Sequence, residues 1–173
     1  MSRVNLAAYG ACAWALAFAV MSFYWAAGGL VAIDTIGGEP ERLARDRDPE
    51  FVAAQWIIGG LKVVAALAVV ALVRSRGQRL PRRVLVLVLG VGGALLLLYE
   101  TAELVQHLVM AVGVVDRGDL DDTALIGHLA FWDPWWILGA GLFVIAAWQQ
   151  RDILRRRSSS SEPREPSHAR PQA

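Results

Sequence analysis

Four long blocks of apolar residues constrain this 173-residue chain more than any other feature of its sequence. A helix needs about 20 largely apolar residues to cross the roughly 30 Å hydrocarbon core of a bilayer. The blocks reach that length at residues 4–30, 51–73, 84–112 and 127–150. We therefore predict an all-α, polytopic membrane protein in which residues 1–150 form a bundle of four transmembrane helices.

The first block is predicted to be a retained helix, not a cleaved signal peptide. It is longer than an ordinary signal core, and it ends in Phe23, Tyr24 and Trp25, which make a poor cleavage site. Within it, alanines recur every four residues and share one helix face, on which a neighbouring helix can approach closely. These alanines are Ala7, Ala11, Ala15 and Ala19.

The distribution of charge predicts the orientation of the chain. Twelve of the 17 basic residues lie at the amino end, in the 74–83 connection or after residue 150, whereas connections 34–50 and 113–126 hold four basic and ten acidic residues. Because cytoplasmic loops carry an excess of Lys and Arg, we expect both termini inside and a multi-pass location in the inner (plasma) membrane. The Arg-rich 74–83 connection and the tail are expected to contact anionic lipid headgroups, not nucleic acid.

Several classes of protein are disfavoured by what the sequence lacks. Cys12 is the only cysteine, so no disulfide or cysteine-based zinc site is predicted within the chain. The sequence has no Gly-rich phosphate loop and no G-x-S-x-G nucleophile motif. We predict no cofactor, and the oligomeric state stays open. Residues 151–173 form a basic cytoplasmic tail that is predicted to be disordered, because it holds too little apolar surface to fold.

Lys62 is the only lysine, and it lies inside the second apolar block. Counted from Phe51 at 1.5 Å per residue, it sits about 16 Å into the membrane, near the midplane. Ionisable residues at this depth are costly and usually face a partner, a cavity or water. Gln55, seven residues earlier, is predicted to share its helix face.

Glu100, Glu103 and His107 follow one another at spacings of three and four residues, so they share one face of the third helix. Glu100 is expected about 6 Å below the outer membrane boundary, where Lys62 can pair with it if the second and third helices are neighbours. The simpler interpretations are a structural ion pair for Lys62 and Glu100, and a solvated helix end for Glu103 and His107.

The last apolar block opens with His128-Leu-Ala-Phe-Trp132-Asp133-Pro134-Trp135-Trp136. Asp133 followed by Pro134 is typical of an N-cap and the first residue of a helix. Alternatively, the helix begins near Asp122 and is kinked at Pro134. Either arrangement places His128 and Asp133 at the outer rim of the membrane.

Histidines and carboxylates gathered on one side of the membrane resemble the ligand sets of divalent metals. The candidate ligands are Glu103, His107, His128 and Asp133. No tight metal motif such as H-E-x-x-H is present, and a helix cap for Asp133 is the simpler interpretation.

Two segments resemble a family of small bacterial membrane proteins that is known only as a domain of unknown function and is widespread in actinobacteria. They are Tyr24-Trp25-Ala-Ala-Gly28-Gly29, which closes the first helix, and His128…Trp132-Asp133-Pro134-Trp135, which opens the last. The resemblance covers roughly residues 5–150 and implies a four-helix membrane fold, without an activity or catalytic residues. In that family a His often precedes the Tyr-Trp pair, whereas this chain has Phe23.

Our leading hypothesis is a non-enzymatic membrane protein with an outward-opening polar pocket that binds a small ligand, an ion or a lipid headgroup. The candidate pocket residues are Lys62, Gln55, Glu100, Glu103, His107, His128 and Asp133. One alternative is a scaffold or interaction subunit whose intramembrane ion pairs hold the helices together. The other is a membrane enzyme acting on a lipid or isoprenoid, with Glu100 or Glu103 as general acid.

Overall fold

The computed structural model describes residues 3–74 and 81–160, with side chains for residues 6–74 and 81–152. The elements are α1 (Arg3–Ala26), α2 (Gly38–Arg45), α3 (Pro49–Val73), α4 (Arg82–Ala111), α5 (Asp122–Gly127), the π-helical turn η1 (His128–Trp132) and α6 (Asp133–Ser160). Segments Leu6–Ala26, Pro49–Val73, Arg82–Ala111 and Asp122–Asp152 are each long and apolar enough to cross a membrane. The predicted all-α fold with four membrane-capable helices is therefore confirmed.

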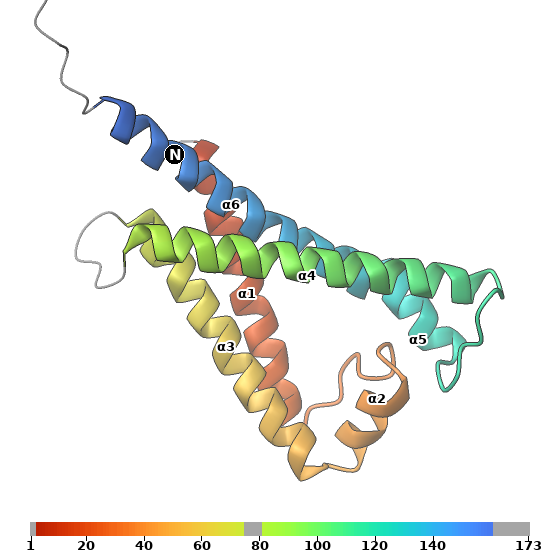
Figure 1. The fold of residues 1–173 in the computed structure, drawn as a ribbon. Helices are drawn as coiled ribbons and strands as arrows, with labels where there is room; N and C mark the ends of the chain where they lie inside the picture. Colours follow the sequence, from red (N-terminus) through yellow and green to blue (C-terminus); the bar gives the residue numbers. More distant parts are fainter. Residues whose placement is uncertain (1–2, 75–80, 161–173) are drawn as a thin grey trace, which may run out of the picture.

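The four long helices form two antiparallel pairs, α1 with α3 and α4 with α6, which meet where α1 packs on α6 (Figure 1). Helices α3 and α4 adjoin where α3 ends and α4 begins, and they diverge from there (Figure 1). We call this end, which carries Arg74, Arg82 and Arg83, the arginine end, and the opposite end, with α2 and α5, the acidic end. Because the long helices are even in number, the start of α1 and the end of α6 both lie at the arginine end.

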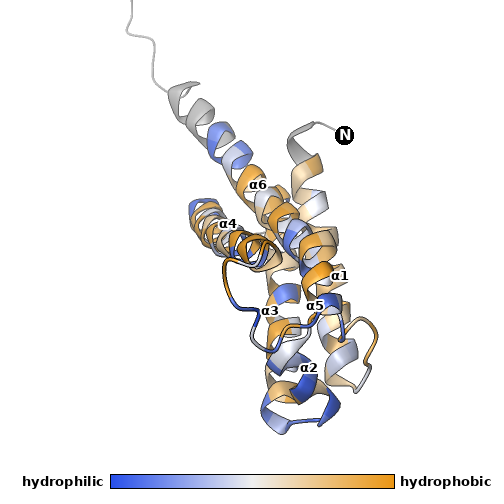
Figure 2. Cartoon of the chain, turned by 90° about the vertical axis from the view of Figure 1, so that its right-hand side faces the viewer, coloured by the Kyte–Doolittle hydropathy of each residue, from blue (hydrophilic) through white to orange (hydrophobic). Residues whose placement is uncertain are grey.

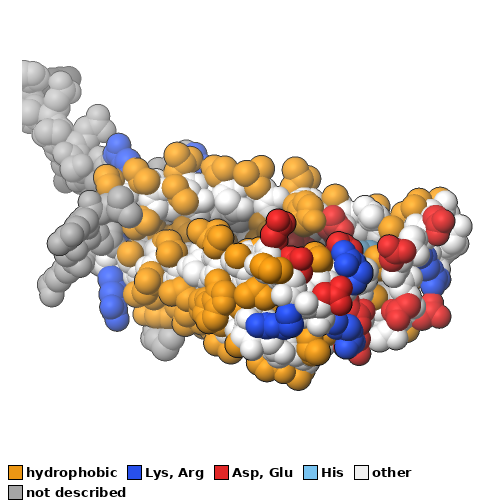
Figure 3. All heavy atoms as spheres, turned by 90° about the horizontal axis from the view of Figure 1, so that it is seen from below, with side chains coloured by type: hydrophobic (Ala, Val, Ile, Leu, Met, Phe, Trp, Pro, Cys, Tyr) orange, Lys and Arg blue, Asp and Glu red, His pale blue; other side chains and the backbone are white. Residues whose placement is uncertain are grey.

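The long helices are apolar on nearly all sides, as Figure 2 shows. Large side chains such as Leu61, Leu67, Leu87 and Leu98 are more than 60% exposed in the isolated chain. A helix that is hydrophobic all round is typical of a lipid environment. Acidic side chains gather toward the acidic end together with several basic ones, as the view from below shows (Figure 3).

The alanine stripe of α1 lies in the core, as predicted. Ala7, Ala11, Ala15 and Ala19 are all buried. Close approach also occurs on another face of α1, where the Trp14 ring lies so close to Gly139 of α6 that a Cβ atom there would overlap it. Small residues therefore let α1 pack tightly against its neighbours.

Helix α1 ends at Ala26, earlier than the expected residue 30, because a glycine cap closes it. The amide of Gly29 donates to the Tyr24 carbonyl and that of Gly28 to the Trp25 carbonyl, both at 2.9 Å, which is a Schellman motif. Gly28 has the positive φ of 101° that this motif needs at its left-handed position. The Arg47 guanidinium also donates to the carbonyls of Trp25 and Ala26 in the last turn of the helix.

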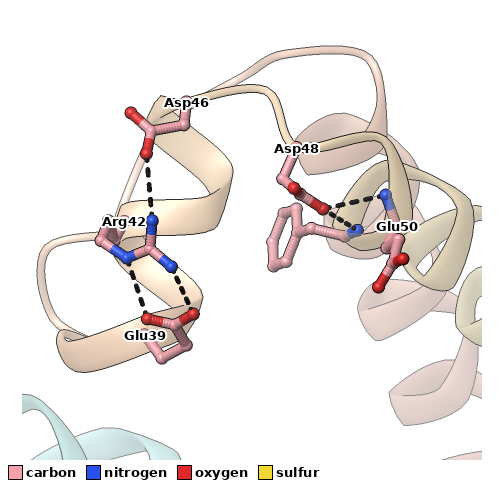
Figure 4. A network of polar contacts seen from close by, with 6 residues as sticks. Glu39, Arg42, Asp46, Asp48 and Glu50 are labelled. Carbon is pink, nitrogen blue, oxygen red and sulfur yellow. Dashed lines mark hydrogen bonds and ion pairs between the residues drawn. The ribbon is translucent and has the colours of Figure 1, made fainter.

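The 34–50 connection contains a short helix, α2, that the sequence analysis did not anticipate. Arg42 on α2 pairs with Glu39 and Asp46 (Figure 4), and its guanidinium lowers the pKa of the Glu39 carboxyl below the ordinary value. These pairs are exposed and contribute little to stability. Asp48 then caps α3 by accepting from the amides of Glu50 and Phe51 at 2.9 and 3.1 Å, as Figure 4 also shows.

The last spanning segment begins at Asp122, so the interpretation of Asp133 as an N-cap is wrong. Asp121 is the cap, and it accepts from the amide of Ala124 at 2.8 Å. Asp133 itself has helical φ and ψ of −62° and −49°. The chain therefore follows the alternative expectation of a helix that begins near Asp122. In place of the expected kink at Pro134, the described irregularity is the π-helical turn η1 that precedes it. Residues 151–160 continue α6, and the rest of the expected tail lies outside the described residues.

Candidate functional site

His107 and Asp133, which are buried, form a cluster with the partly buried His128 between α4 and the irregular turn that precedes α6. His107 Nδ1 lies 2.7 Å from Asp133 Oδ2, and His128 Nδ1 lies 3.3 Å from Asp133 Oδ1. The two imidazole rings stack with their centroids 4.2 Å apart. Asp133 is 2% exposed and His107 is 5% exposed, so the central pair is shielded from the surroundings.

The π-helical turn η1 aims His128 and Asp133 at the same point. Within it the amide of Asp133 donates to the carbonyl of His128, five residues back in place of four. One such wide turn inside an α-helix is often found at functional sites. Pro134, which has no amide hydrogen to give to the helix, follows directly. His128 and Asp133 thus both face α4.

The connection between α1 and α2 covers the cluster. The indole nitrogen of Trp132 donates to Thr35 Oγ1 at 3.0 Å, and His128 Nε2 lies 3.0 Å from the Ile36 carbonyl oxygen. Gly127 packs so tightly against this segment that a Cβ atom there would overlap the Thr35 carbonyl oxygen. Sequence reasoning missed Thr35 and Ile36, because a backbone carbonyl and a lone threonine in a loop carry no recognisable pattern.

The contact with Ile36 determines where His128 carries its hydrogen. A carbonyl oxygen only accepts, so Nε2 must be the protonated nitrogen, and in a neutral imidazole Nδ1 then holds a lone pair. That lone pair faces an oxygen of Asp133. Two electron-rich atoms at this distance repel each other unless a cation, either a proton or a metal ion, lies between them.

The other predicted acidic residues lie nearby but outside this contact set. Glu100 is 7% exposed and makes no hydrogen bond or ion pair within the described part of the chain, although the charges of Asp133 and Glu103 act on it. Glu103 is half-buried beside the Tyr99 hydroxyl. The face of α4 that the spacing predicted therefore exists, with Glu100 and His107 as its buried members.

Lys62 is separated from these carboxylates and does not pair with Glu100. Its ammonium donates to Ser22 Oγ at 2.9 Å and lies 5.0 Å and 5.1 Å from the ring centroids of Phe18 and Trp136. The expected pair does not form because α3 and α4 diverge toward the acidic end (Figure 1). Gln55 on α3 is half-buried and makes no side-chain hydrogen bond among the described residues. The sequence analysis expected one polar pocket, whereas the structure places Lys62 at one site and the cluster of His107, His128 and Asp133 at another.

Packed apolar helices with a buried polar cluster at one end define a multi-pass membrane protein of the all-α class. Within that class, the sequence profile of the family described as "Protein of unknown function (DUF3995)" matches residues 15–143. The chain belongs to this family, as the resemblance indicated. Comparisons with curated proteins and with solved structures gave no match.

Proposed function

We propose that this membrane protein binds a divalent transition-metal ion at His107, His128 and Asp133, which we name the HDH cluster. One observation carries the proposal: the lone pair of His128 faces a carboxylate oxygen inside a buried site, so a cation is needed between them. One potential ligand atom from each residue lies within 4.8 Å of the others. Two imidazoles and one carboxylate suit Zn²⁺ and related ions.

The surroundings of His128 support a metal more than a proton. Histidines that bind metals usually donate their second N–H to a backbone carbonyl or a carboxylate, which fixes the ring and the tautomer. The contact from His128 Nε2 to the Ile36 carbonyl has this form. Donor atoms that bind one ion at about 2.1 Å lie about 3.0–3.4 Å apart, a range that the contacts of His107 and His128 with the two oxygens of Asp133, at 2.7 and 3.3 Å, approach.

Glu100 is the candidate for a fourth ligand, although its side chain must move to reach the ion, since its carboxylate is outside the group of ligand atoms that lie within 4.8 Å of one another. It is buried on the same face of α4 as His107, two turns away, and no described residue neutralises its charge. A buried carboxylate without a partner is unfavourable, and coordination to a cation would relieve that cost. The site would then carry two carboxylates and two imidazoles, which compensate the charge of a divalent ion.

The test is metal titration of the full chain in detergent after removal of metal with a chelator. We expect one equivalent of Zn²⁺ or Co²⁺ to bind, with a rise in melting temperature, because saturation at 100 times Kd stabilises a fold by about 2.7 kcal/mol. Binding should weaken as the pH falls, since imidazole and carboxylate ligands must release their protons to bind.

The variants His128→Ala and Asp133→Asn should lose the bound equivalent, while His168→Ala, which removes the remaining histidine of the chain, should keep it. Circular dichroism checks that each variant is folded. Stoichiometric binding that survives in folded His128→Ala, or that is lost in His168→Ala, contradicts the proposal.

A further inference from the structure

The ammonium of Lys62 is a charge in the middle of a spanning helix without an anionic partner. Lys62 is the fourteenth of the 25 residues of α3, so it lies about 16–20 Å from either end of that helix. No carboxylate in the described part of the chain lies within ion-pairing distance of it. Ser22 takes one of its three N–H donors, which leaves two unused. Ions inside membranes usually occur in pairs, so an anion is missing here.

A cavity of about 390 Å³ adjoins this lysine, between α1, α3, α4 and α6. Lys62 is the only charged residue among those that line it, and the wall is otherwise apolar, with Trp14, Leu61, Leu89 and Phe143 among its members. One water molecule occupies ~30 Å³ in the liquid, and a methylene group is about as large. The volume of the cavity therefore corresponds to about thirteen methylene groups. A space of this size suits one hydrocarbon chain.

The wall runs along the line where α3 and α4 separate. On α3 it extends from Ile58 to Ala68, and on α4 from Val88 to Leu96. The helices diverge from their junction at the arginine end (Figure 1). The lining residues all belong to the four segments that are apolar and long enough to span a membrane, so the bilayer surrounds the cavity. An anion that reaches Lys62 by this route must come from within the membrane and must carry an apolar chain.

We propose that this cavity binds a single-chain fatty carboxylate, with its carboxylate on the Lys62 ammonium and its acyl chain along the apolar wall between α3 and α4. The two unused donors of Lys62 match the two oxygens of a carboxylate. Phe18 and Trp136 flank the ammonium, with ring centroids 5.0 and 5.1 Å from it. The site is independent of the HDH cluster, because none of the cluster residues lines the cavity.

The test uses brominated stearic acid added to the full chain in detergent, with tryptophan fluorescence as the readout. Bromine quenches an indole only at short range, and Trp14 lines the cavity. We expect saturable quenching in the natural chain and in Lys62→Arg, which keeps the charge. In Lys62→Met the apparent affinity should fall at least about tenfold. The brominated methyl ester, with the same chain and no charge, should bind no better to the natural chain than to Lys62→Met.

Two outcomes would overturn the proposal. One is equal quenching of the natural chain and of a Lys62→Met variant that circular dichroism shows to be folded. The other is that brominated phosphatidic acid, with two chains and a phosphate, binds as tightly as the fatty acid, which would exclude a single-chain carboxylate as the preferred occupant. Binding of Co²⁺ by Lys62→Met is a matched control, since the HDH cluster should be unaffected.

Discussion

Asp133 illustrates how one residue acquires a role that its local sequence does not reveal. An Asp before a Pro is normally read as a helix cap. Here the helix has already begun at Asp122, and the carboxylate lies in the interior with its two oxygens close to the Nδ1 atoms of two imidazoles. The types of residue in the cluster were predicted from the sequence. Their contacts were not, because they depend on a π-helical turn and on the order of the helices, neither of which leaves a pattern in sequence spacing.

Gly127 offers a test of how closely the loop before α2 is held against the last helix. Gly127→Ala places a methyl group against the Thr35 carbonyl oxygen, a backbone atom that cannot move aside as a side chain can. We expect a loss of about 1–3 kcal/mol in the free energy of unfolding, as for other overpacked sites. Metal affinity at the HDH cluster should fall as well, because Ile36, which orients His128, is the next residue.

The control for Gly127→Ala is Gly141→Ala in α6, where an added Cβ meets nothing within 4 Å. An alanine in an open helix position stabilises by about 0.5–1 kcal/mol. Thermal unfolding in one detergent compares the two variants. Equal stability of Gly127→Ala and Gly141→Ala would contradict the close contact.

At the scale of the helical element, the sequence predicted the spans well and their packing poorly. A length of about 20 apolar residues is a requirement of the bilayer and can be read directly. The helix faces that pack together cannot be read from the sequence in this way, because helices that are apolar all round show no preferred side. The alanine stripe of α1 was the exception, since its spacing marks a face that is both small and buried. The prediction that Lys62 pairs with Glu100 was wrong, because it assumed that two helices consecutive in the chain lie side by side along their whole length.

The burial of the alanine stripe on α1 predicts that a large side chain within it destabilises the fold. Ala11→Leu adds a large side chain at a position with no exposed surface, and it should destabilise the fold by about 1–3 kcal/mol. Ala13→Leu, on an exposed face of the same helix, should change stability by less than about 0.5 kcal/mol. Chemical or thermal unfolding in detergent measures both. A destabilised Ala13→Leu together with an unaffected Ala11→Leu would show that the packed face of α1 is misplaced.

At the scale of the whole molecule, the placement of both ends of the spanning region at the arginine end agrees with an even number of spans. We propose that this end lies in the cytoplasm, because it carries most of the basic residues. In a Cys12→Ser background, Asp119→Cys should react with a membrane-impermeant maleimide in intact cells. Gln78→Cys should react only after lysis. The reverse pattern would invert the orientation and place the HDH cluster near the inner face.

The HDH cluster also has a consequence for the order in which the chain is made. His107 belongs to the third long helix and Asp133 to the fourth, and the segment that covers them follows the first. During synthesis His107 must therefore wait in the growing membrane-inserted chain until the final helix leaves the ribosome. A chain that stops before residue 133 would leave the His107 imidazole without its carboxylate partner.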